Sequence, residues 1–181
     1  MRIISGALKG RRLISPQWSG LRPTSDRLRE TLFNVLGALV SGARVLDGFA
    51  GTGAIGIEAL SRGAIHVTFI ERDRRSYELI ARNLHKCDVT KGYAIIPAEV
   101  GCDESILSEE CDFDLIVLDP PYEFGALGEV LVKTGRMLAR NGVLVLEHAK
   151  RQEVQAEIGV LRRTRVVVSG NSQLSFYERE E

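Results

Sequence analysis

Residues 45–56 read VLDGFAGTGAIG, and their pattern is the strongest indication of architecture in the chain. An apolar run ends at Asp47, and the glycines Gly51, Gly53 and Gly56 then follow with the spacing GxGxxG. A strand, a glycine-rich turn and a helix in this order form the ligand-binding crossover of an open α/β sheet, where backbone N–H groups at the start of the helix can approach a ligand. The stretch therefore predicts such a crossover, with a tight turn that binds no ligand as the alternative.

Apolar runs alternate with amphipathic segments on the C-terminal side of this turn. Runs without polar alternation are typical of strands buried on both faces, so they predict a parallel sheet covered by helices. The pair Asn141-Gly142 predicts a turn ahead of the last of these runs, and residues 161–177 predict an antiparallel hairpin at one edge. The predicted strands lie near residues 44–46, 66–70, 93–96, 114–118 and 143–146, and the predicted helices near 26–42, 54–61, 73–86 and 127–138.

Length and composition describe one soluble globular domain. The chain has 181 residues, 44% of them hydrophobic, which is enough to bury a core without disulfides or a metal. Its cysteines, Cys87, Cys102 and Cys111, have no CxxC spacing and its three histidines lie far apart, which argues against a zinc module and a disulfide scaffold. No apolar stretch is long enough for a membrane span or a signal peptide, so we expect a cytoplasmic protein that binds no membrane. Because no interface stripe is evident, we also expect a monomer.

The formal net charge is zero, but the charges are unevenly distributed. The first 44 residues carry eight basic and two acidic side chains, a balance of +6, and the remaining 137 carry 16 basic and 22 acidic side chains, a balance of −6. A basic segment on an acidic body favours a polyanionic partner, because each Lys or Arg placed on a phosphate releases condensed counterions. A solvated basic surface is the alternative. The candidate contacts are Arg2, Lys9, Arg11 and Arg12.

Residues 1–23 differ in character from the rest of the chain. Short alternating runs broken by glycine and proline predict a strand or hairpin arm, followed at residues 24–181 by the main domain. After Pro23, either Ser25 or Asp26 can cap a helix whose apolar positions recur at helical spacing. We expect this helix to pack on the body and to carry the arm with it.

Glu71 ends the second predicted strand, 20 residues beyond Gly51. An acidic side chain at this position can accept hydrogen bonds from both ribose hydroxyls of an adenosine. The spacing suits S-adenosylmethionine and NAD equally, so an NAD-dependent oxidoreductase is a second interpretation. Asp47 favours S-adenosylmethionine, because a carboxylate beside the loop amides would repel a pyrophosphate and suits a zwitterionic or cationic ligand.

The tetrapeptide Asp119-Pro120-Pro121-Tyr122 directly follows a buried run. Two prolines cannot continue a sheet, so these residues predict a rigid turn at the edge where ligands bind. The Asp119 carboxylate and the Pro120 carbonyl could accept the two hydrogens of a nucleobase amino group and aim its lone pair at a sulfonium methyl. Tyr122 offers an aromatic face to a base that has left its stack. The tetrapeptide therefore predicts methyl transfer to a planar nitrogen without a metal, and a purely structural turn is the alternative.

Three segments together resemble a known family. The run RPTSDRLRETLFN at residues 22–34, the glycine turn and the DPPY tetrapeptide are similar to those of bacterial 16S ribosomal RNA (guanine-N2)-methyltransferases of the RsmD type. The similarity covers nearly the whole chain. It implies a Rossmann-like class I S-adenosylmethionine-dependent methyltransferase fold, with a seven-stranded, mostly parallel α/β sheet, a C-terminal antiparallel hairpin and a short N-terminal extension that contacts RNA. It also implies that the substrate is a guanine of 16S rRNA in the small ribosomal subunit.

The resemblance also implies roles for individual residues. It places the cofactor against Asp47, Phe49, Gly51, Gly53, Glu71 and Ala98. It places the target base against Asp119, Pro120, Pro121 and Tyr122, and the RNA against Arg22, Thr24 and Arg27. One position departs from the pattern, because Pro97-Ala98 stands where many such enzymes have an acidic or amide residue before an alanine. Contact with the cofactor's adenine then falls to the backbone near Ala98 or to Glu99.

Other acceptors and other classes of protein fit parts of the same pattern. The tetrapeptide specifies only a planar nitrogen, so adenine N6 in DNA or RNA, or a glutamine amide in a protein, is an alternative acceptor. The basic arm favours nucleic acid over protein. A non-catalytic ribosome-assembly factor with the same fold is a further alternative.

Overall fold

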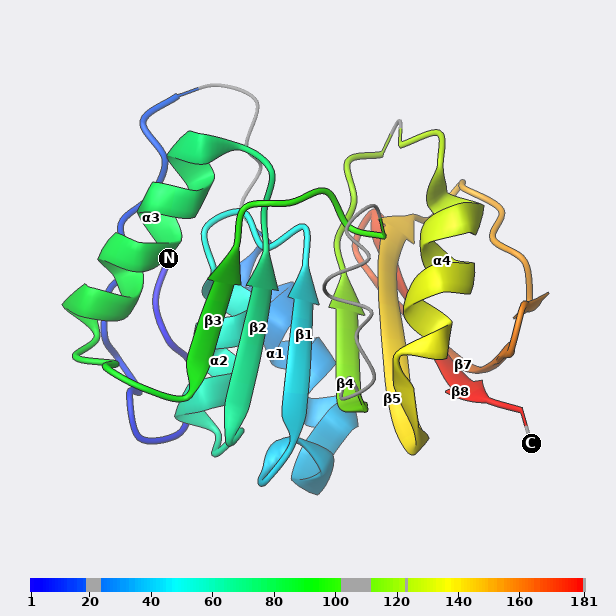
Figure 1. Ribbon diagram of the computed structural model, residues 1–181, viewed down its shortest axis with the longest axis horizontal. Helices are drawn as coiled ribbons and strands as arrows, with labels where there is room; N and C mark the ends of the chain where they lie inside the picture. The colour runs from blue at the N-terminus through cyan, green and yellow to red at the C-terminus, as the bar shows by residue number, and fades with distance from the viewer. Residues whose placement is uncertain (19–23, 102–111, 123, 181) are drawn as a thin grey trace.

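A mixed sheet of eight strands forms the centre of the computed structural model, which describes residues 1–18, 24–101, 112–122 and 124–180 (Figure 1). The strand order is β3-β2-β1-β4-β5-β8-β7-β6, in which the first five are parallel and the remaining pairs are antiparallel. This confirms the predicted parallel sheet with a C-terminal hairpin, and a two-residue strand, β6, adds an eighth strand to the seven expected. The strands are β1 Arg44–Gly48, β2 His66–Ile70, β3 Tyr93–Ile96, β4 Phe113–Leu118, β5 Leu138–Ala149, β6 Glu157–Ile158, β7 Leu161–Ser169 and β8 Ser172–Arg179.

Helices cover both faces of the sheet. Neighbouring strand residues point to opposite faces, so Val45 and Val117 belong to one hydrophobic core, and Leu46 and Leu118 belong to the other. The first core is covered by α1 (Asp26–Leu36), the 3₁₀ helix η1 (Gly37–Val40), α2 (Ala54–Ser61) and α3 (Arg74–Lys86), and the second by α4 (Leu127–Arg136). Within the described ranges, none of the helices combines the length and the apolar character that a membrane span requires.

Side-chain caps fix where two of these helices begin. The Ser25 hydroxyl accepts a hydrogen bond from the Leu28 N–H at the start of α1. The Asp73 carboxylate accepts hydrogen bonds from the N–H groups of Arg75 and Ser76 at the start of α3. Both helix starts lie at the carboxyl edge of the sheet, so the caps hold two sides of the region where ligands are expected.

Three predicted boundaries differ from the structure. The helix predicted to residue 42 ends at Leu36 and continues as η1, because Gly37 has a φ of 55°, outside the α-helical region. The predicted turn at Asn141-Gly142 and the helical placement of Leu138 are wrong, since all three residues lie in β5. A Cβ on Gly142 would lie 2.8 Å from the carbonyl oxygen of Phe113. Glycine is therefore needed at this position for the close approach of β4 and β5, and it forms no turn there.

The N-terminal arm packs against the domain. Arg2 and Arg12 form an isolated antiparallel bridge, and backbone hydrogen bonds on both sides of it join residues 1–3 to residues 10–13, so the predicted hairpin is present in short form. Ile3 and Leu13 follow the two bridge residues and are 1% and 5% exposed, and both belong to the core beneath α1, α2 and α3. The arm is therefore held by apolar burial as well as by hydrogen bonds.

A buried cluster of charges joins the arm to α1 and α2. Glu58 of α2 is fully buried, and its carboxylate accepts hydrogen bonds from the backbone N–H groups of Ile4 (2.8 Å) and Ser5 (3.0 Å). Arg29 of α1 is also fully buried, with Nη1 3.6 Å from Glu58 Oε2 and Nη2 donating to the carbonyl oxygen of Arg2. One carboxylate and one guanidinium thus connect three segments that are distant in sequence.

Candidate active site

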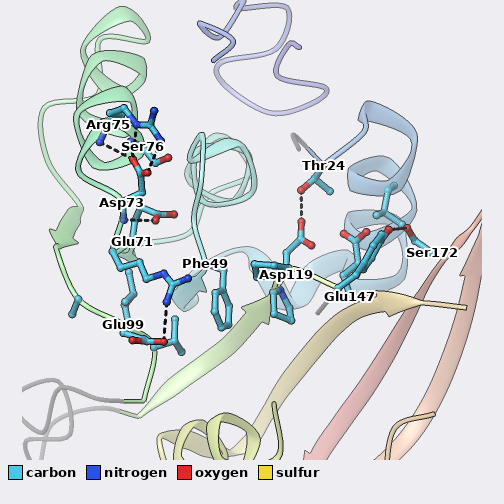
Figure 2. Close-up of a pocket in the computed structure, with 18 of the residues that line it drawn as sticks. Thr24, Phe49, Glu71, Asp73, Arg75, Ser76, Glu99, Asp119, Glu147 and Ser172 are labelled. Carbon is cyan, nitrogen blue, oxygen red and sulfur yellow. Dashed lines mark hydrogen bonds and ion pairs between the residues drawn. The ribbon is translucent and has the colours of Figure 1, made fainter. Parts of the chain in front are cut away.

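A cavity of about 510 Å³ opens at the carboxyl edge of the sheet (Figure 2). One end is bordered by the residues that follow β2 and by the start of α3, and Glu71 lies there. The other end is bordered by the residues that follow β4, beginning with Asp119. Figure 2 shows Phe49 between these two ends. The cavity therefore joins Glu71 to the DPPY tetrapeptide.

Asp47 is the penultimate residue of β1, beneath the glycine turn. It is 1% exposed, and its Oδ2 accepts a hydrogen bond of 2.8 Å from the Gly56 N–H in the first turn of α2. Burial raises the pKa of Asp47 well above its usual range, the Gly56 hydrogen bond opposes this rise, and the carboxylates of Asp119 and Glu71 add to it. A Cβ on Gly56 would lie 2.2 Å from the Phe69 ring, so this glycine permits close packing of α2 on β2. Asp47 therefore supports the turn from behind the cavity wall.

Glu71 ties the glycine turn to the start of α3. Its Oε2 accepts a hydrogen bond from the Gly51 N–H and its Oε1 accepts one from the Asp73 N–H, both of 2.8 Å. Gly51 and Gly53 have φ values of 55° and 76°, a region that glycine adopts without strain. In the described structure these two glycines shape the turn without lining the cavity, whereas Glu71 lines it.

Phe49 lines the middle of the cavity with an unusual backbone conformation. Its φ of 61° lies in the left-handed region, which is rare for a bulky residue and is concentrated at ligand sites. Its ring meets that of Phe124 edge to face, with centroids 5.0 Å apart and an interplanar angle of 76°. Ala98 and Glu99 line the cavity on the Glu71 side, where Glu99 forms a 3.1 Å ion pair with Arg72.

The DPPY tetrapeptide forms the other end of the cavity, and all four of its residues line it. Thr24, just before α1, donates a 2.6 Å hydrogen bond from its hydroxyl to Asp119 Oδ2. The Tyr122 hydroxyl lies 3.3 Å from the Ser172 hydroxyl at the start of β8, and 42% of Tyr122 is exposed. Thr24 thus holds the Asp119 carboxylate, and Ser172 holds the hydroxyl end of the Tyr122 ring.

Comparisons with known proteins agree with this geometry. A family model described as Conserved hypothetical protein 95 matches residues 1–178. Ribosomal RNA small subunit methyltransferase D of Escherichia coli (strain K12) is 36% identical over 188 residues, which cover 99% of this chain and 90% of the relative. The chain belongs to the RsmD family.

Two further similarities extend over the whole chain. YlbH of Bacillus subtilis (strain 168) is 35% identical to this RsmD-family chain over 182 residues, which cover 99% of each protein. The solved structure of yhhF from Escherichia coli has a TM-score of 0.84 at 33% identity, covering 99% of this chain and 98% of that one. These similarities confirm the predicted Rossmann-like methyltransferase fold.

The RsmD-family cavity contains residues that the sequence did not single out. The arm contributes Trp18, and the Arg75 guanidinium lies 5.3 Å from the centroid of the Trp18 ring. Glu147 of β5 and Ser172 of β8 line the Asp119 end. The one signal for Glu147 is a carboxylate at the end of the apolar run Val143-Leu144-Val145-Leu146, and the sequence has no motif around it.

The predicted RNA contacts of the RsmD-family chain are placed mainly outside the cavity. Arg2, Lys9, Arg11, Arg12 and Arg27 are exposed on the arm and on α1, whereas Thr24 lines the cavity itself. Two of these residues have partners within the chain, since Arg2 lies 3.9 Å from Asp26 and Arg11 forms a 2.5 Å ion pair with Asp88. Arg22 lies outside the described residues.

Cysteines and other metal-binding side chains are not grouped in the part of the RsmD-family chain that the structure describes. No cluster of three His, Cys, Asp or Glu side chains suited to a metal ion occurs there. Cys87 is buried, and Cys102 and Cys111 lie outside the described residues.

Proposed function

We propose that this chain transfers a methyl group from S-adenosylmethionine to the exocyclic N2 of a guanine in 16S rRNA of the small ribosomal subunit. The observation that carries the proposal is one cavity that joins Glu71 and Phe49 to Asp119 and Tyr122. Membership in the RsmD family and the small-subunit rRNA methyltransferase among its relatives support the reaction class and the RNA substrate. We expect the protein to act in the cytoplasm as a monomer.

The Glu71 end of the cavity fits S-adenosylmethionine. A carboxylate offers about four lone-pair sites, so Glu71 can accept ribose hydroxyls in addition to its two backbone N–H groups. Carboxylates at both ends of the cavity, Glu71 and Asp119, favour a ligand with positive charge. S-adenosylmethionine supplies a methyl group activated by a positively charged sulfur, so the reaction needs no metal.

The Asp119 end fits a nucleobase amino group. The Asp119 carboxylate and the Pro120 carbonyl accept the two N2 hydrogens, which turns the nitrogen lone pair out of the plane of the ring. N2 loses a proton when it gains the methyl group, and the Asp119 carboxylate is placed to receive that proton. The exposed face of Tyr122, held at its hydroxyl by Ser172, provides a stacking surface for a base removed from its helix.

Incorporation of labelled methyl from S-adenosylmethionine tests the proposal directly. The acceptors are unmodified 30S subunits, protein-free 16S rRNA, duplex DNA and a glutamine-containing peptide, and the products are identified as nucleosides or amino acids. We expect N2-methylguanosine from the subunits. N6-methyladenosine or methylglutamine would replace the proposed acceptor with one of the alternatives, and no incorporation into any acceptor would favour a binding protein.

Thr24 is expected to position Asp119 for the reaction. Thr24→Val keeps the shape of the side chain but removes the hydroxyl that donates to Asp119 Oδ2. We expect kcat to fall about 10-fold with little change in KM, because the carboxylate loses its alignment. Thr24→Ser keeps the hydroxyl and should restore kcat in the same steady-state assay. Equal losses in the valine and serine variants would contradict this role.

The basic arm is expected to contribute to RNA affinity. Arg11→Ala combined with Arg12→Ala removes two exposed charges, although Arg11 is already paired with Asp88. We expect weaker RNA binding and a salt dependence of log K that is flatter by about 0.7 to 0.9 for each phosphate that the variant no longer neutralises. Filter binding at several salt concentrations measures the slope. Arg151→Ala combined with Arg165→Ala, at exposed positions of the C-terminal half, is the matched control. An unchanged slope in the arm variant would remove Arg11 and Arg12 from the RNA site.

A further inference from the structure

Glu147 lies beside Asp119 at the edge of the sheet. β4 and β5 are parallel, and Leu118 is the register partner of Leu146. The residues that follow this pair are Asp119, directly after β4, and Glu147, within β5, so we expect them at neighbouring positions and on the same face. Both line the cavity, and Figure 2 shows the two side chains on the same side of Phe49. The Asp119 end of the cavity thus presents two carboxylates from adjacent strands.

The position of Glu147 is costly for a charged side chain. It is 7% exposed, and it follows four apolar residues of β5. A carboxylate taken out of water loses hydration free energy that an apolar side chain of the same size would not lose. Glu147 also lines the cavity, where its carboxylate can meet a ligand.

A guanine and an adenine present different groups to such a pair of carboxylates. On its Watson–Crick edge, guanine has donors at two adjacent positions, N1–H and the N2 amino group. Adenine has a donor at N6 but an acceptor at N1. A base removed from its stack is recognised through this edge. A second carboxylate next to the one that holds the amino group therefore attracts guanine and repels the N1 lone pair of adenine.

We propose that Glu147 is the residue that selects guanine, by accepting a hydrogen bond from N1–H while Asp119 holds the N2 amino group. This inference rests on the proposed function and adds the basis of its base specificity. Sites built to hydrogen-bond a polar group of the substrate reject analogues that lack it by large factors, about 10⁴-fold or more in the strongest cases. Glu147 is thus a specificity residue, separate from the role of Asp119 in the reaction.

Glu147→Gln is the informative substitution, because an amide keeps the size of the side chain and can either accept or donate. It can donate to N1 of adenine, which the carboxylate cannot do. Subunits are assembled on two 16S transcripts that carry either guanine or adenine at the position methylated by the parent enzyme. For each, kcat/KM is measured with identification of N2-methylguanosine or N6-methyladenosine. Glu157→Gln, at an exposed position of β6, is the matched control.

We expect kcat/KM of the Gln variant on the guanine transcript to fall about 10-fold. We expect its ratio of kcat/KM for guanine over adenine to fall at least about 100-fold. Binding of S-adenosylmethionine, measured by calorimetry, should be unchanged, as should both rates in the Glu157→Gln control. If Glu147→Gln kept the parent's ratio of kcat/KM for the two transcripts, whether or not both rates fell, the inference would be overturned and Glu147 would be a structural residue. If the parent enzyme makes no N2-methylguanosine, the proposed function itself fails, and this inference fails with it.

Discussion

Asp119→Ala is expected to lower kcat for methyl transfer about 10²-fold or more. The substitution removes the acceptor that orients the amino nitrogen and that is placed to take up its proton. It also removes the partner of the Thr24 hydroxyl. Because Glu71 lies at the other end of the cavity, the affinity for S-adenosylmethionine should change little.

Single-turnover methylation of 30S subunits measures this loss, and calorimetry with S-adenosylmethionine shows whether the cofactor still binds. Asp112→Ala is the matched control, since Asp112 is an exposed carboxylate just before the opposite end of β4. Methyl incorporation by Asp119→Ala at the parent rate would remove Asp119 from catalysis. A loss of cofactor affinity as large as the loss of rate would assign Asp119 to the cofactor site instead.

Glu58→Gln is expected to lower the free energy of unfolding by about 3 to 5 kcal/mol. The substitution removes the negative charge opposite the fully buried Arg29. The new amide N–H₂ group also faces the N–H of either Ile4 or Ser5, because the carboxylate accepts from these two donors through different oxygens. Arg29 Nη2 keeps a 2.6 Å ion pair with Asp26, which is partly exposed. In the described structure Arg29 Nε and Nη1 have no hydrogen-bond partner, so Glu58 is the buried counter-charge for that side of the guanidinium. A buried charge that loses its partner is far more destabilising than the pair was stabilising.

Urea unfolding gives the free-energy difference, and amide hydrogen exchange of Ile4 and Ser5 reports whether the arm has come away. Glu78→Gln is the matched control, because it removes one carboxylate from an exposed pair with Arg74. We expect that control to cost less than about 1 kcal/mol. Equal effects of the two substitutions would show that the buried cluster does not hold the arm.

The glycine turn and the DPPY tetrapeptide could be predicted from the sequence because their residue types have local causes. Glycines at Gly51 and Gly53 permit positive φ, and two prolines end a strand wherever they occur. The order of strand, turn and helix then places both motifs at the carboxyl edge of a parallel sheet. The sequence does not specify from which side of a turn a ligand approaches. Asp47 is therefore expected to contact the ligand, whereas in the structure it is buried and does not line the cavity.

Contacts between distant segments explain why the sequence does not indicate the positions of Glu147, Arg29 and Glu58. The register of β4 and β5 sets Glu147 at the position next to Asp119, and this register depends on strand pairing and on the tight contact at Gly142. Arg29 and Glu58 lie on helices where charged residues are normally solvated, but both are buried and form hydrogen bonds with the backbone of the arm. Neither relation has a local signature in the chain.

The docked arm also has a consequence for protein synthesis. Ile4 and Ser5 require a carboxylate 54 and 53 residues further along the chain, and the Ile14 N–H requires the Asn83 amide oxygen, 69 residues further along. A ribosome adds about 5–20 residues per second, so the arm waits several seconds for these partners after it has been made. The arm is translated before its partners and is therefore among the last segments to reach its folded position. A docked arm indicates that the chain through α3 has left the exit tunnel and folded.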